Sequence, residues 1–300
     1  MARILARDLI RQGVSTSRAL LSHQDKIWSR YSRDKVDIGE TLARVLRTLS
    51  KALPLELPLR ALSVGSSTEP QFRILEASFL GGLYLLDIER AALAVINERI
   101  QRQALTHVFT LRDNYTEIFA DRDRTRRFLR EALGGRRLHL IAFEHSLYYC
   151  PADRWRQLLD NVFEVLLAPA GAVHCVMMSA SATDPSTTTW LYNHFAGKFF
   201  GHRERPGPGR LRPRCGAGPV VQGAKILTKR DRVRFFVDDF RALMSVVWMI
   251  LLYPNVHRYT PAQRREITEH VYRHLFAERK PLFQDQDHLV IYRGVSKGLI

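Results

Sequence analysis

Short apolar runs alternate with amphipathic segments through the middle of the chain, and this alternation constrains the fold more than any other feature of the sequence. The runs are four to seven residues long, and the segments between them carry apolar residues at helical spacing. Strands that helices cover on both faces read as continuous apolar runs, because neither face meets water. We therefore predict a parallel sheet with helices on both sides. The predicted strands are 61–64, 83–86, 108–111, 138–143 and 172–178, and the predicted helices are 71–79, 90–105, 124–133 and 151–167.

The chain before this alternation is organised differently. Apolar residues recur at helical spacing up to about residue 50, and Pro54 and Pro58 break that pattern before the first strand. We expect an N-terminal helical segment, acting as a lid, over residues 1–52, followed by one larger domain over residues 53–300.

The regular alternation stops after residue 178. A polar loop and an aromatic-rich segment, 190–200, lead into a Pro/Gly/Arg-rich tract at about 203–219. The remaining predicted elements are a strand at 233–237, helices at 238–253 and 261–280, and a final strand at 288–293. The two helices form an insert, 238–280, before the last strand.

The composition limits the classes of protein to which the chain can belong. Its 300 residues are 46% hydrophobic, enough for a substantial core, but the longest apolar run, 242–253, is too short to span a bilayer. The N-terminus lacks the regions of a secretory signal, and the three cysteines lack the CxxC spacing of a zinc site. No nucleophile elbow, Walker A loop or dinucleotide-binding GxGxxG is present. We expect a soluble protein of the reducing cytoplasm, with no metal site and no membrane partner.

The net charge of +16 is concentrated in one part of the sequence. Between residues 203 and 234, ten Lys or Arg residues stand against two acids, so this stretch carries +8, half of the total. Three interpretations of the tract stay open: a solvated loop, a contact for nucleic acid or an acidic partner, and an anomaly of the coding sequence.

The first predicted strand ends abruptly in the segment "VGSSTEP". Gly65 allows the chain to turn and to approach a ligand closely. In a doubly wound sheet, ligands bind at the carboxyl ends of the strands. The backbone N–H groups at the start of the next helix belong to Ser66, Ser67 and Thr68. The turn therefore has the composition of a ligand-binding loop.

Polar residues also follow the next three strands. Asp87 ends the second strand, 22 residues after Gly65, where a carboxylate can accept hydrogen bonds from both hydroxyls of a ribose. Ile88 can pack on an adenine face, and Asp113 and Asn114 after the third strand can contact the adenine amino group. The fourth strand opens into Glu144, His145 and Tyr148, which we place beside a reaction centre.

Together, these four strand ends resemble the motifs of the class I S-adenosylmethionine-dependent methyltransferases. "ALSVGSST" resembles the cofactor loop, "LYLLDIE" the segment with the ribose-binding acid, "RDNY" the adenine contact, and "FEHSLYYC" the fourth motif. The resemblance covers residues 60–178 well and 233–293 weakly, and the helical insert is similar to that of small-molecule N- and O-methyltransferases. The first motif departs from the family's glycine-rich pattern, because Gly65 is its only glycine and Ser63 stands where the family usually has an acid.

The resemblance implies a fold and a reaction. The fold is a three-layer α/β/α Rossmann-like sheet, mostly parallel with an antiparallel last strand, over which the N-terminal segment with Trp28 and Tyr31 closes. The reaction is direct transfer of a methyl group, with inversion at carbon, from S-adenosylmethionine to a small-molecule acceptor at nitrogen, oxygen or a carboxyl group, leaving S-adenosylhomocysteine. The implied cofactor-binding residues are Gly65, Ser66, Ser67, Thr68, Asp87, Ile88, Asp113, Asn114 and Phe143, and the catalytic candidates are His145, Glu144 and Tyr148.

Simpler interpretations of these residues also stay open. Gly65 can be a turn glycine without a ligand, and Asp87 can be the N-cap of the following helix. The segment around Asp113 has the composition of an ordinary turn. His145 acts as a general base only if the acceptor must lose a proton, and is otherwise a loop histidine.

A pair of histidines near the C-terminus has the spacing of metal ligands. His270 and His274 stand four residues apart, with Glu266 one turn earlier. The HExxH order is absent, and the amphipathic pattern of this segment explains its composition without a metal.

Two other functions fit the sequence less well but stay open. One is a nucleic-acid methyltransferase or an RNA- or DNA-binding module, for which the basic tract argues. The other is a catalytically silent protein with the methyltransferase fold, for which the glycine-poor first motif argues.

Overall fold

The computed structural model describes residues 2–65, 70–201, 224–252 and 257–296. The chain divides into two compact units. We call one the sheet unit, which is built from Lys35–Met177, Gly207–Lys229 and Asp287–Ile300. We call the other the helical unit, which is built from Met1–Asp34, Met178–Pro206 and Arg230–Gln286.

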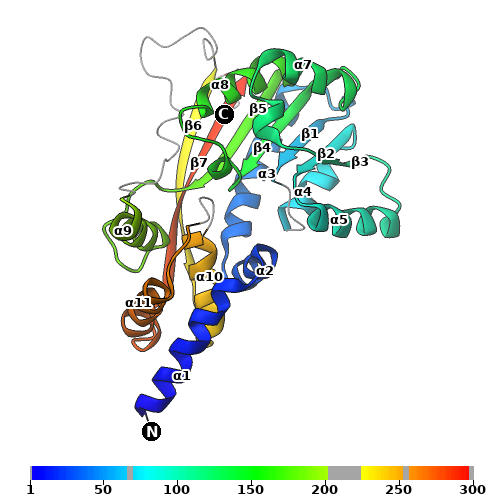
Figure 1. Cartoon of the computed structure of the whole chain (residues 1–300). Helices are drawn as coiled ribbons and strands as arrows, with labels where there is room; N and C mark the ends of the chain where they lie inside the picture. Colours follow the sequence, from blue (N-terminus) through cyan, green and yellow to red (C-terminus); the bar gives the residue numbers. More distant parts are fainter. Residues whose placement is uncertain (1, 66–69, 202–223, 253–256, 297–300) are drawn as a thin grey trace. The chain divides into compact units, whose positions relative to one another are not determined.

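A seven-stranded sheet with the order β3-β2-β1-β4-β5-β7-β6 forms the framework (Figure 1). The strands β1 to β5 pair in parallel, and β7, the last strand along the chain, runs antiparallel. The predicted sheet class is therefore confirmed. The strands are β1 (Arg60–Val64), β2 (Gly82–Asp87), β3 (Val108–Arg112), β4 (Leu138–Glu144), β5 (Leu167–Met178), β6 (Lys225–Phe235) and β7 (Leu282–Arg293).

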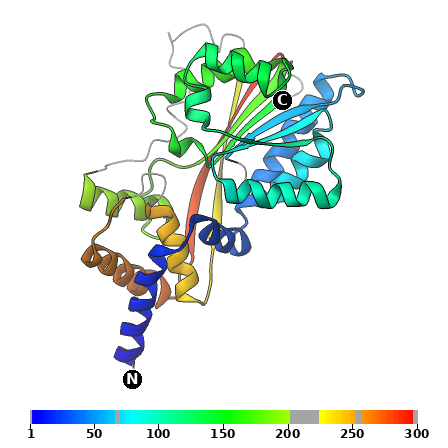
Figure 2. The ribbon, with the colours of Figure 1, turned by 45° about the vertical axis from the view of Figure 1, so that its right-hand side comes forward.

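Helices lie on both faces of the strands in the sheet unit, as both views of the ribbon show (Figures 1 and 2). One group packs through a cluster that includes Leu42, Leu75 and Leu83, and the other through a cluster that includes Leu62, Phe119 and Leu158. The first group is α3 (Asp34–Ala52), α4 (Pro70–Ser78) and α5 (Arg90–Gln103). The second is α6 (Tyr115–Ile118), α7 (Arg122–Glu131), η2 (Leu147–Tyr149), α8 (Trp155–Asn161) and η3 (Val162–Leu166).

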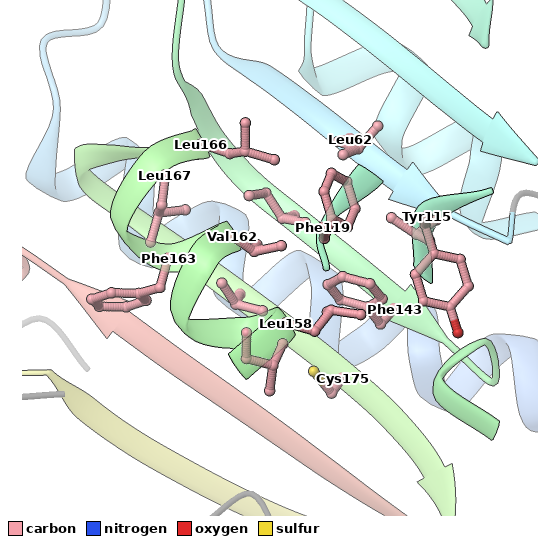
Figure 3. Packing of buried hydrophobic residues seen from close by; sticks show 14 of the residues in the cluster. Leu62, Tyr115, Phe119, Phe143, Leu158, Val162, Phe163, Leu166, Leu167 and Cys175 are labelled. Carbon is pink, nitrogen blue, oxygen red and sulfur yellow. The ribbon is translucent and has the colours of Figure 1, made fainter. Parts of the chain in front are cut away.

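The two clusters explain why the strands read as apolar runs. Neighbouring residues of a strand point to opposite faces, so Ala61 joins one cluster and Leu62 the other. Figure 3 shows the second cluster, in which Phe119 and Phe143 lie beside Leu62 and against the helix that carries Leu158. Because both faces of β1 are covered, none of its residues can be polar without a partner.

The helical unit contains α1 (Ala2–Ser15), η1 (Thr16–Arg18), α2 (Leu21–Tyr31), α9 (Thr188–Phe200), α10 (Phe240–Leu252), α11 (Pro261–Val271) and η6 (Tyr272–Phe276). The Trp28 ring stacks on Phe235 at 5.5 Å between ring centroids, and its indole N–H donates to the buried Asp34 at 2.9 Å. Tyr31 is more exposed and meets the edge of the same phenylalanine. Trp28 thus lies in the core of this unit, and the boundary at residue 52 and the role of the N-terminal segment as a lid stay predictions.

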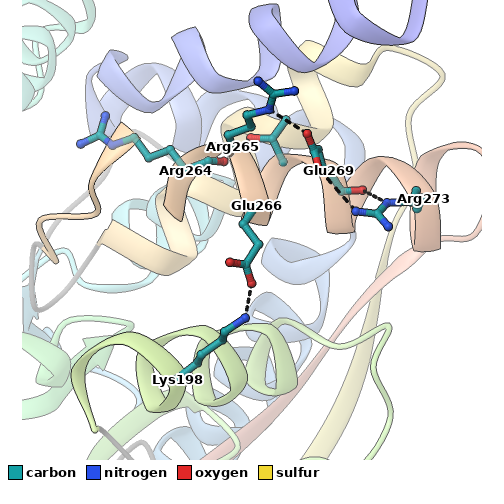
Figure 4. A network of polar contacts seen from close by, with 7 residues as sticks. Lys198, Arg264, Arg265, Glu266, Glu269 and Arg273 are labelled. Atoms are coloured by element: carbon teal, nitrogen blue, oxygen red, sulfur yellow. Dashed lines mark hydrogen bonds and ion pairs between the residues drawn. The ribbon is translucent and has the colours of Figure 1, made fainter. Parts of the chain in front are cut away.

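One exposed ion pair connects α9 with α11, and two others lie along α11 and the turn that follows it (Figure 4). Lys198 on α9 pairs with Glu266 on α11, and Arg265 and Arg273 both reach Glu269, at 2.8 and 3.4 Å. Because these side chains are exposed to water, each pair stabilises the fold by no more than about 1 kcal/mol. The buried side of α11 carries most of its packing.

The structure corrects several predicted boundaries. The predicted helix over 151–167 begins only at Trp155 and ends in a wider, π-helical turn at Leu166, after which β5 starts five residues before the predicted 172–178. The predicted helix over 261–280 likewise ends in a π-helical turn at Phe276. The strands β6 and β7 begin well before their predicted starts at 233 and 288, and β6 ends at Phe235 instead of 237. Their early residues alternate or are charged, and so lack the apolar run on which the prediction relied.

Two histidines face each other in the interior of the sheet unit. His174 on β5 and His288 on β7 are both buried, and their Nε2 and Nδ1 atoms lie 3.2 Å apart. Burial, together with the neighbouring His288, lowers the pKa of His174 to about 3. The pair is therefore stable only when His174 is neutral.

This pair predicts a loss of stability in acid. Above pH 6.5, His174 is neutral in both the folded and the unfolded chain and contributes no pH dependence. As the pH falls from about 6.5 toward 3, the unfolded chain takes up a proton that the folded chain excludes, so the free energy of unfolding falls by up to about 1.4 kcal/mol per pH unit. Denaturant titrations at several pH values measure this slope.

His174→Phe provides the comparison, because it keeps a planar ring beside His288 but takes up no proton. We expect a shallower slope for this variant and an unchanged slope for His23→Gln, which alters an exposed histidine. Equal slopes for wild type and His174→Phe would contradict the assignment.

Candidate functional site

The strand order creates a switch point between β1 and β4. The chain proceeds from β1 outward to β2 and β3, and then begins again at β4 on the other side of β1. In parallel sheets of this kind, ligands bind outside the carboxyl ends of the strands at the switch point. Val64 and Phe143 are paired at this end of the two strands, so the residues that follow them flank the site.

Gly65 turns the chain directly after β1. Its φ of +74° is in the left-handed region, and its N–H donates to the carbonyl of Leu86 at 2.9 Å. A Cβ on this residue would lie 2.7 Å from the Cβ of Ser146. Both the conformation and the space require glycine, so the residue has a structural role whether or not a ligand binds.

Asp87 ends β2 with its carboxyl group half-buried. Burial raises the pKa of this carboxyl group, while hydrogen bonds from the backbone N–H groups of Glu89 and Ile88 lower it, and the N–H of Glu89 lies 2.8 Å from Oδ1. The N-cap of α5 is Glu89, whose side chain accepts from the N–H of Ala91. The alternative that Asp87 caps this helix is therefore wrong, and its carboxyl group instead holds the backbone of the turn before the helix.

The residues predicted to contact adenine have different surroundings. Ile88 is 64% exposed, as a residue must be to pack on a ligand. Asp113 is also exposed and borders a surface hollow of about 420 Å³ between β3 and α7. Asn114 caps α6, and its Oδ1 accepts from the N–H of Thr116 at 3.1 Å. The side chain of Asn114 therefore has a structural task, whereas Ile88 and Asp113 face solvent.

The three catalytic candidates lie at the end of β4 and just after it, and the structure brings two of them, His145 and Tyr148, into contact. Glu144, His145 and Tyr148 are all partly buried, and His145 has a φ of +53°, which is uncommon for a residue with a Cβ. The Nδ1 atom of His145 lies 3.3 Å from the Tyr148 hydroxyl, and the two rings are nearly parallel. Strained residues of this kind cluster at functional sites.

Phe143 lies apart from these candidates in the apolar core. Its side chain is buried and meets the edge of the Tyr115 ring at 6.0 Å between centroids (Figure 3). Of the predicted cofactor-binding residues, the structure thus places Phe143 in the packing and Asp87, Ile88 and Asp113 at strand ends.

Two residues of this region had no signal in the sequence. The Tyr115 hydroxyl donates to the carbonyl of Ser146 at 2.7 Å, and burial raises the pKa of Tyr115. Ser146 is itself buried against Gly65. Only the pairing of β1 with β4 brings these parts of the chain together, and a sequence pattern does not report that proximity.

Some predicted residues lie outside the part of the chain that the structure describes. These are Ser66, Ser67 and Thr68 of the predicted cofactor loop, together with the Arg-rich tract at 203–219. Their predicted roles stay predictions.

No metal site is formed within residues 2–65, 70–201, 224–252 and 257–296, where no group of three or more His, Cys, Asp or Glu side chains is placed to hold an ion. The His270 ring stacks on Trp190 at 5.7 Å between ring centroids, and it lies tilted against the His274 ring at 4.4 Å. On the same helix, Ile267 and Val271 are fully buried. The amphipathic interpretation of this segment is thereby supported.

Among the described residues, no helix combines the length and the apolar character needed to cross a membrane.

Comparison with known proteins shows similarity at the level of fold. The sequence matches no family model and no curated protein sequence. The YcgJ protein of Bacillus subtilis superposes with a TM-score of 0.51 at 10% identity, covering 84% of this chain and 98% of that one. Together with the strand order and the antiparallel β7, this match confirms the predicted three-layer Rossmann-like fold.

Two further solved structures are more distant. The N-methyltransferase NodS of Bradyrhizobium japonicum WM9 gives a TM-score of 0.40 at 13% identity, covering 85% of this chain and 94% of that one. Phosphoethanolamine N-methyltransferase 2 of Haemonchus contortus, solved with S-adenosylmethionine, gives 0.44 at 10% identity, covering 84% of this chain and 52% of that one.

The close approach of Gly65 to Ser146 predicts a specific cost of adding a Cβ. Gly65→Ala and Gly201→Ala both place alanine at a φ near +73°, which costs about 1–2 kcal/mol. Among the described residues, nothing lies within 4 Å of a Cβ at Gly201, whereas Gly65→Ala must also displace Ser146. We expect Gly65→Ala to reduce the free energy of unfolding by at least about 1 kcal/mol more than Gly201→Ala, as measured by denaturant titration. Equal losses would show that the turn has room for a side chain.

Proposed function

We propose that this chain is a methyltransferase that uses S-adenosylmethionine and transfers a methyl group to a small-molecule acceptor. The observation that carries the proposal is the half-buried carboxyl group of Asp87 at the end of β2, next to the switch point between β1 and β4. The resemblance of the sequence motifs and the fold support the same assignment. When bound, the cofactor supplies a methyl group on a sulfonium, which is already a good leaving group.

The described residues fit such a ligand. Gly65 turns the chain at the end of β1 without a side chain, in a conformation with a φ of +74°. Asp87 keeps one carboxyl oxygen for the N–H of Glu89, and the other can accept from a ribose hydroxyl. Burial removes water from the Asp87 carboxyl group and so destabilises its charged form. Hydrogen-bond donors on a ligand would stabilise the carboxylate in place of that water.

An adenine ring fits beside this carboxylate. Ile88 follows Asp87 directly and offers an exposed apolar side chain on which the ring can pack. Asp113, at the end of the adjacent β3, is an acceptor for the exocyclic amino group. Asn114 supports this loop by capping α6.

The segment after β4 is assigned to the acceptor side of the reaction. Alignment of the nucleophile with the methyl group provides most of the catalysis in such a transfer, and a base is needed only where the acceptor must lose a proton. The His145 ring, held near the Tyr148 hydroxyl at 3.3 Å, can take up that proton. Glu144 and Tyr148 are the further candidates for contact with the acceptor.

Isothermal titration with S-adenosylmethionine and S-adenosylhomocysteine tests the proposal. We expect both ligands to bind wild type, and Asp87→Ala to weaken binding by about 1–3 kcal/mol, because the ribose hydroxyls lose their acceptor. Asp87→Asn keeps one oxygen for the N–H of Glu89 but loses the charge, so its affinity should fall between the two.

Asp238→Ala is the matched control, since it removes an exposed carboxylate that pairs with Arg279 in the helical unit. Its affinity should equal that of wild type. A folded wild-type protein that binds neither ligand would reject the cofactor assignment and favour a catalytically silent protein with this fold. Binding without loss in Asp87→Ala would place the ribose elsewhere.

A further inference from the structure

The strand β3 has an open edge. In the described part of the chain, β3 stands at the end of the strand order and pairs only with β2, so one side of its backbone meets no other strand (Figure 1). The carbonyl of His107 and the N–H of Asp113 form hydrogen bonds to β2. Backbone groups alternate in direction along a strand, so those of Val108, Thr110 and Arg112 point outward. An edge of this kind is a template for a further strand.

This edge carries few of the charges that usually prevent strand pairing. Natural edge strands often contain Lys, Arg or Pro, which disfavour the addition of another strand. The opposite edge strand, β6, has such residues along its length, among them Lys229, Arg230 and Arg232. In contrast, β3 is charged only at its last residue, Arg112, and the Phe109 side chain is 43% exposed. The strand β3 is therefore suited to pair with another chain.

Two surface hollows follow this edge. The amino-end hollow, of about 430 Å³, is lined by β3 from Val108 to Leu111, with walls from α5 on one face of the sheet and from the segment after α7 on the other. The carboxyl-end hollow, of about 420 Å³, begins at Thr110 and continues past the end of β3. Together they leave space beside β3 over its whole length.

We propose that β3 is the surface through which two copies of this chain associate, with their β3 strands paired antiparallel about Thr110. Val108 then stands opposite Arg112 of the second copy, and Thr110 stands opposite Thr110. The outward N–H and C=O groups of these residues meet as the hydrogen-bonded pairs of an antiparallel ladder. The pairing joins the two sheets into one, and the inference goes beyond the proposed function and does not depend on it.

The apolar side chains of β3 match in this register. Phe109 stacks on Tyr84 at 5.2 Å between ring centroids, and Leu111, two residues later, packs on the same face. In the antiparallel pair, Phe109 lies directly opposite Leu111 of the second copy. Aromatic and aliphatic side chains in such cross-strand pairs contact each other, so the exposed ring of Phe109 becomes covered.

The charges of the two hollows are complementary. The amino-end hollow contains Arg136, whose exposed side chain forms no ion pair within the described residues. The carboxyl-end hollow contains the acids Asp113, Glu117 and Glu131. Its arginines are Arg112, Arg124 and Arg127, and an ion pair within the same copy already occupies Arg124. Antiparallel pairing places each amino-end hollow beside the carboxyl-end hollow of the second copy, so Arg136 meets a surface on which acids outnumber the remaining arginines.

Analytical ultracentrifugation over a range of protein concentrations tests this surface, and we expect wild type to form a reversible dimer. Thr110→Pro removes an outward N–H and leaves the bonds to β2 in place, and Phe109→Lys puts a charge at the contact. Each should weaken the dimer by about tenfold or more. Val95→Lys is the matched control, because it adds the same charge at an exposed apolar residue of α5 that lines neither hollow. Its dissociation constant should stay within about twofold of wild type. Circular dichroism shows that each variant is folded.

Two charge variants test the antiparallel direction. We use Glu117 because α6 and the segment that carries Arg136 lie on the same face of the sheet. Arg136→Glu and Glu117→Arg each bring like charges together in their own homodimers, so each should weaken association. A mixture of the two variants should associate more tightly than either variant alone, because every contact in the mixed dimer then joins Glu to Arg.

The outcomes that would overturn the proposal are distinct. Wild type that stays monomeric up to its highest soluble concentration would exclude self-association and leave the β3 edge to an extended segment of another protein. A dimer that neither Thr110→Pro nor Phe109→Lys weakens would place the interface elsewhere. A mixture of the charge variants that is no tighter than its components would exclude the antiparallel register. None of these results bears on cofactor binding.

Discussion

The contact between Gly65 and Ser146 fixes the geometry on which the rest of the candidate site depends. It joins the ends of β1 and β4, the two strands between which the direction of the sheet changes. A side chain at Gly65 would push these ends apart, and the carboxylate of Asp87 would then stand at a different distance from the segment after β4. The absence of a side chain on Gly65 thus determines the separation between the Asp87 carboxylate and the segment after β4.

The central part of the fold could be predicted from the sequence because its strands are covered on both faces. In β1, Ala61 and Leu62 both need apolar surroundings, although they belong to different clusters. At the edge, β6 carries Arg230, Arg232 and Arg234 on an exposed side, so it has no apolar run to mark its start. An edge strand buries only part of its surface, so its sequence shows a weaker hydrophobic pattern.

The same distinction applies to the site. Gly65 and Asp87 could be identified from the sequence because each ends an apolar run within a short, regular spacing. Ser146 and Tyr115 could not, because their importance comes from contacts between segments that are far apart in the chain, and those contacts depend on the pairing of β1 with β4. Phe143 shows the reverse case: it is the first residue of the fourth motif, for which the resemblance implied a ligand contact, and its side chain lies buried in the core.

The beginning of α5 shows how two neighbouring acids divide structural and functional tasks. A helix needs an acceptor for its first free N–H groups, and an acid at the end of the preceding strand would ordinarily supply it. Here Glu89 provides that acceptor, two residues later, and Asp87 uses a single oxygen to hold the N–H of Glu89 itself. The turn between them leaves the Ile88 side chain exposed to solvent. A half-buried carboxylate and an exposed apolar side chain therefore follow one another at the end of β2, and our proposal of a nucleoside site rests on these two residues.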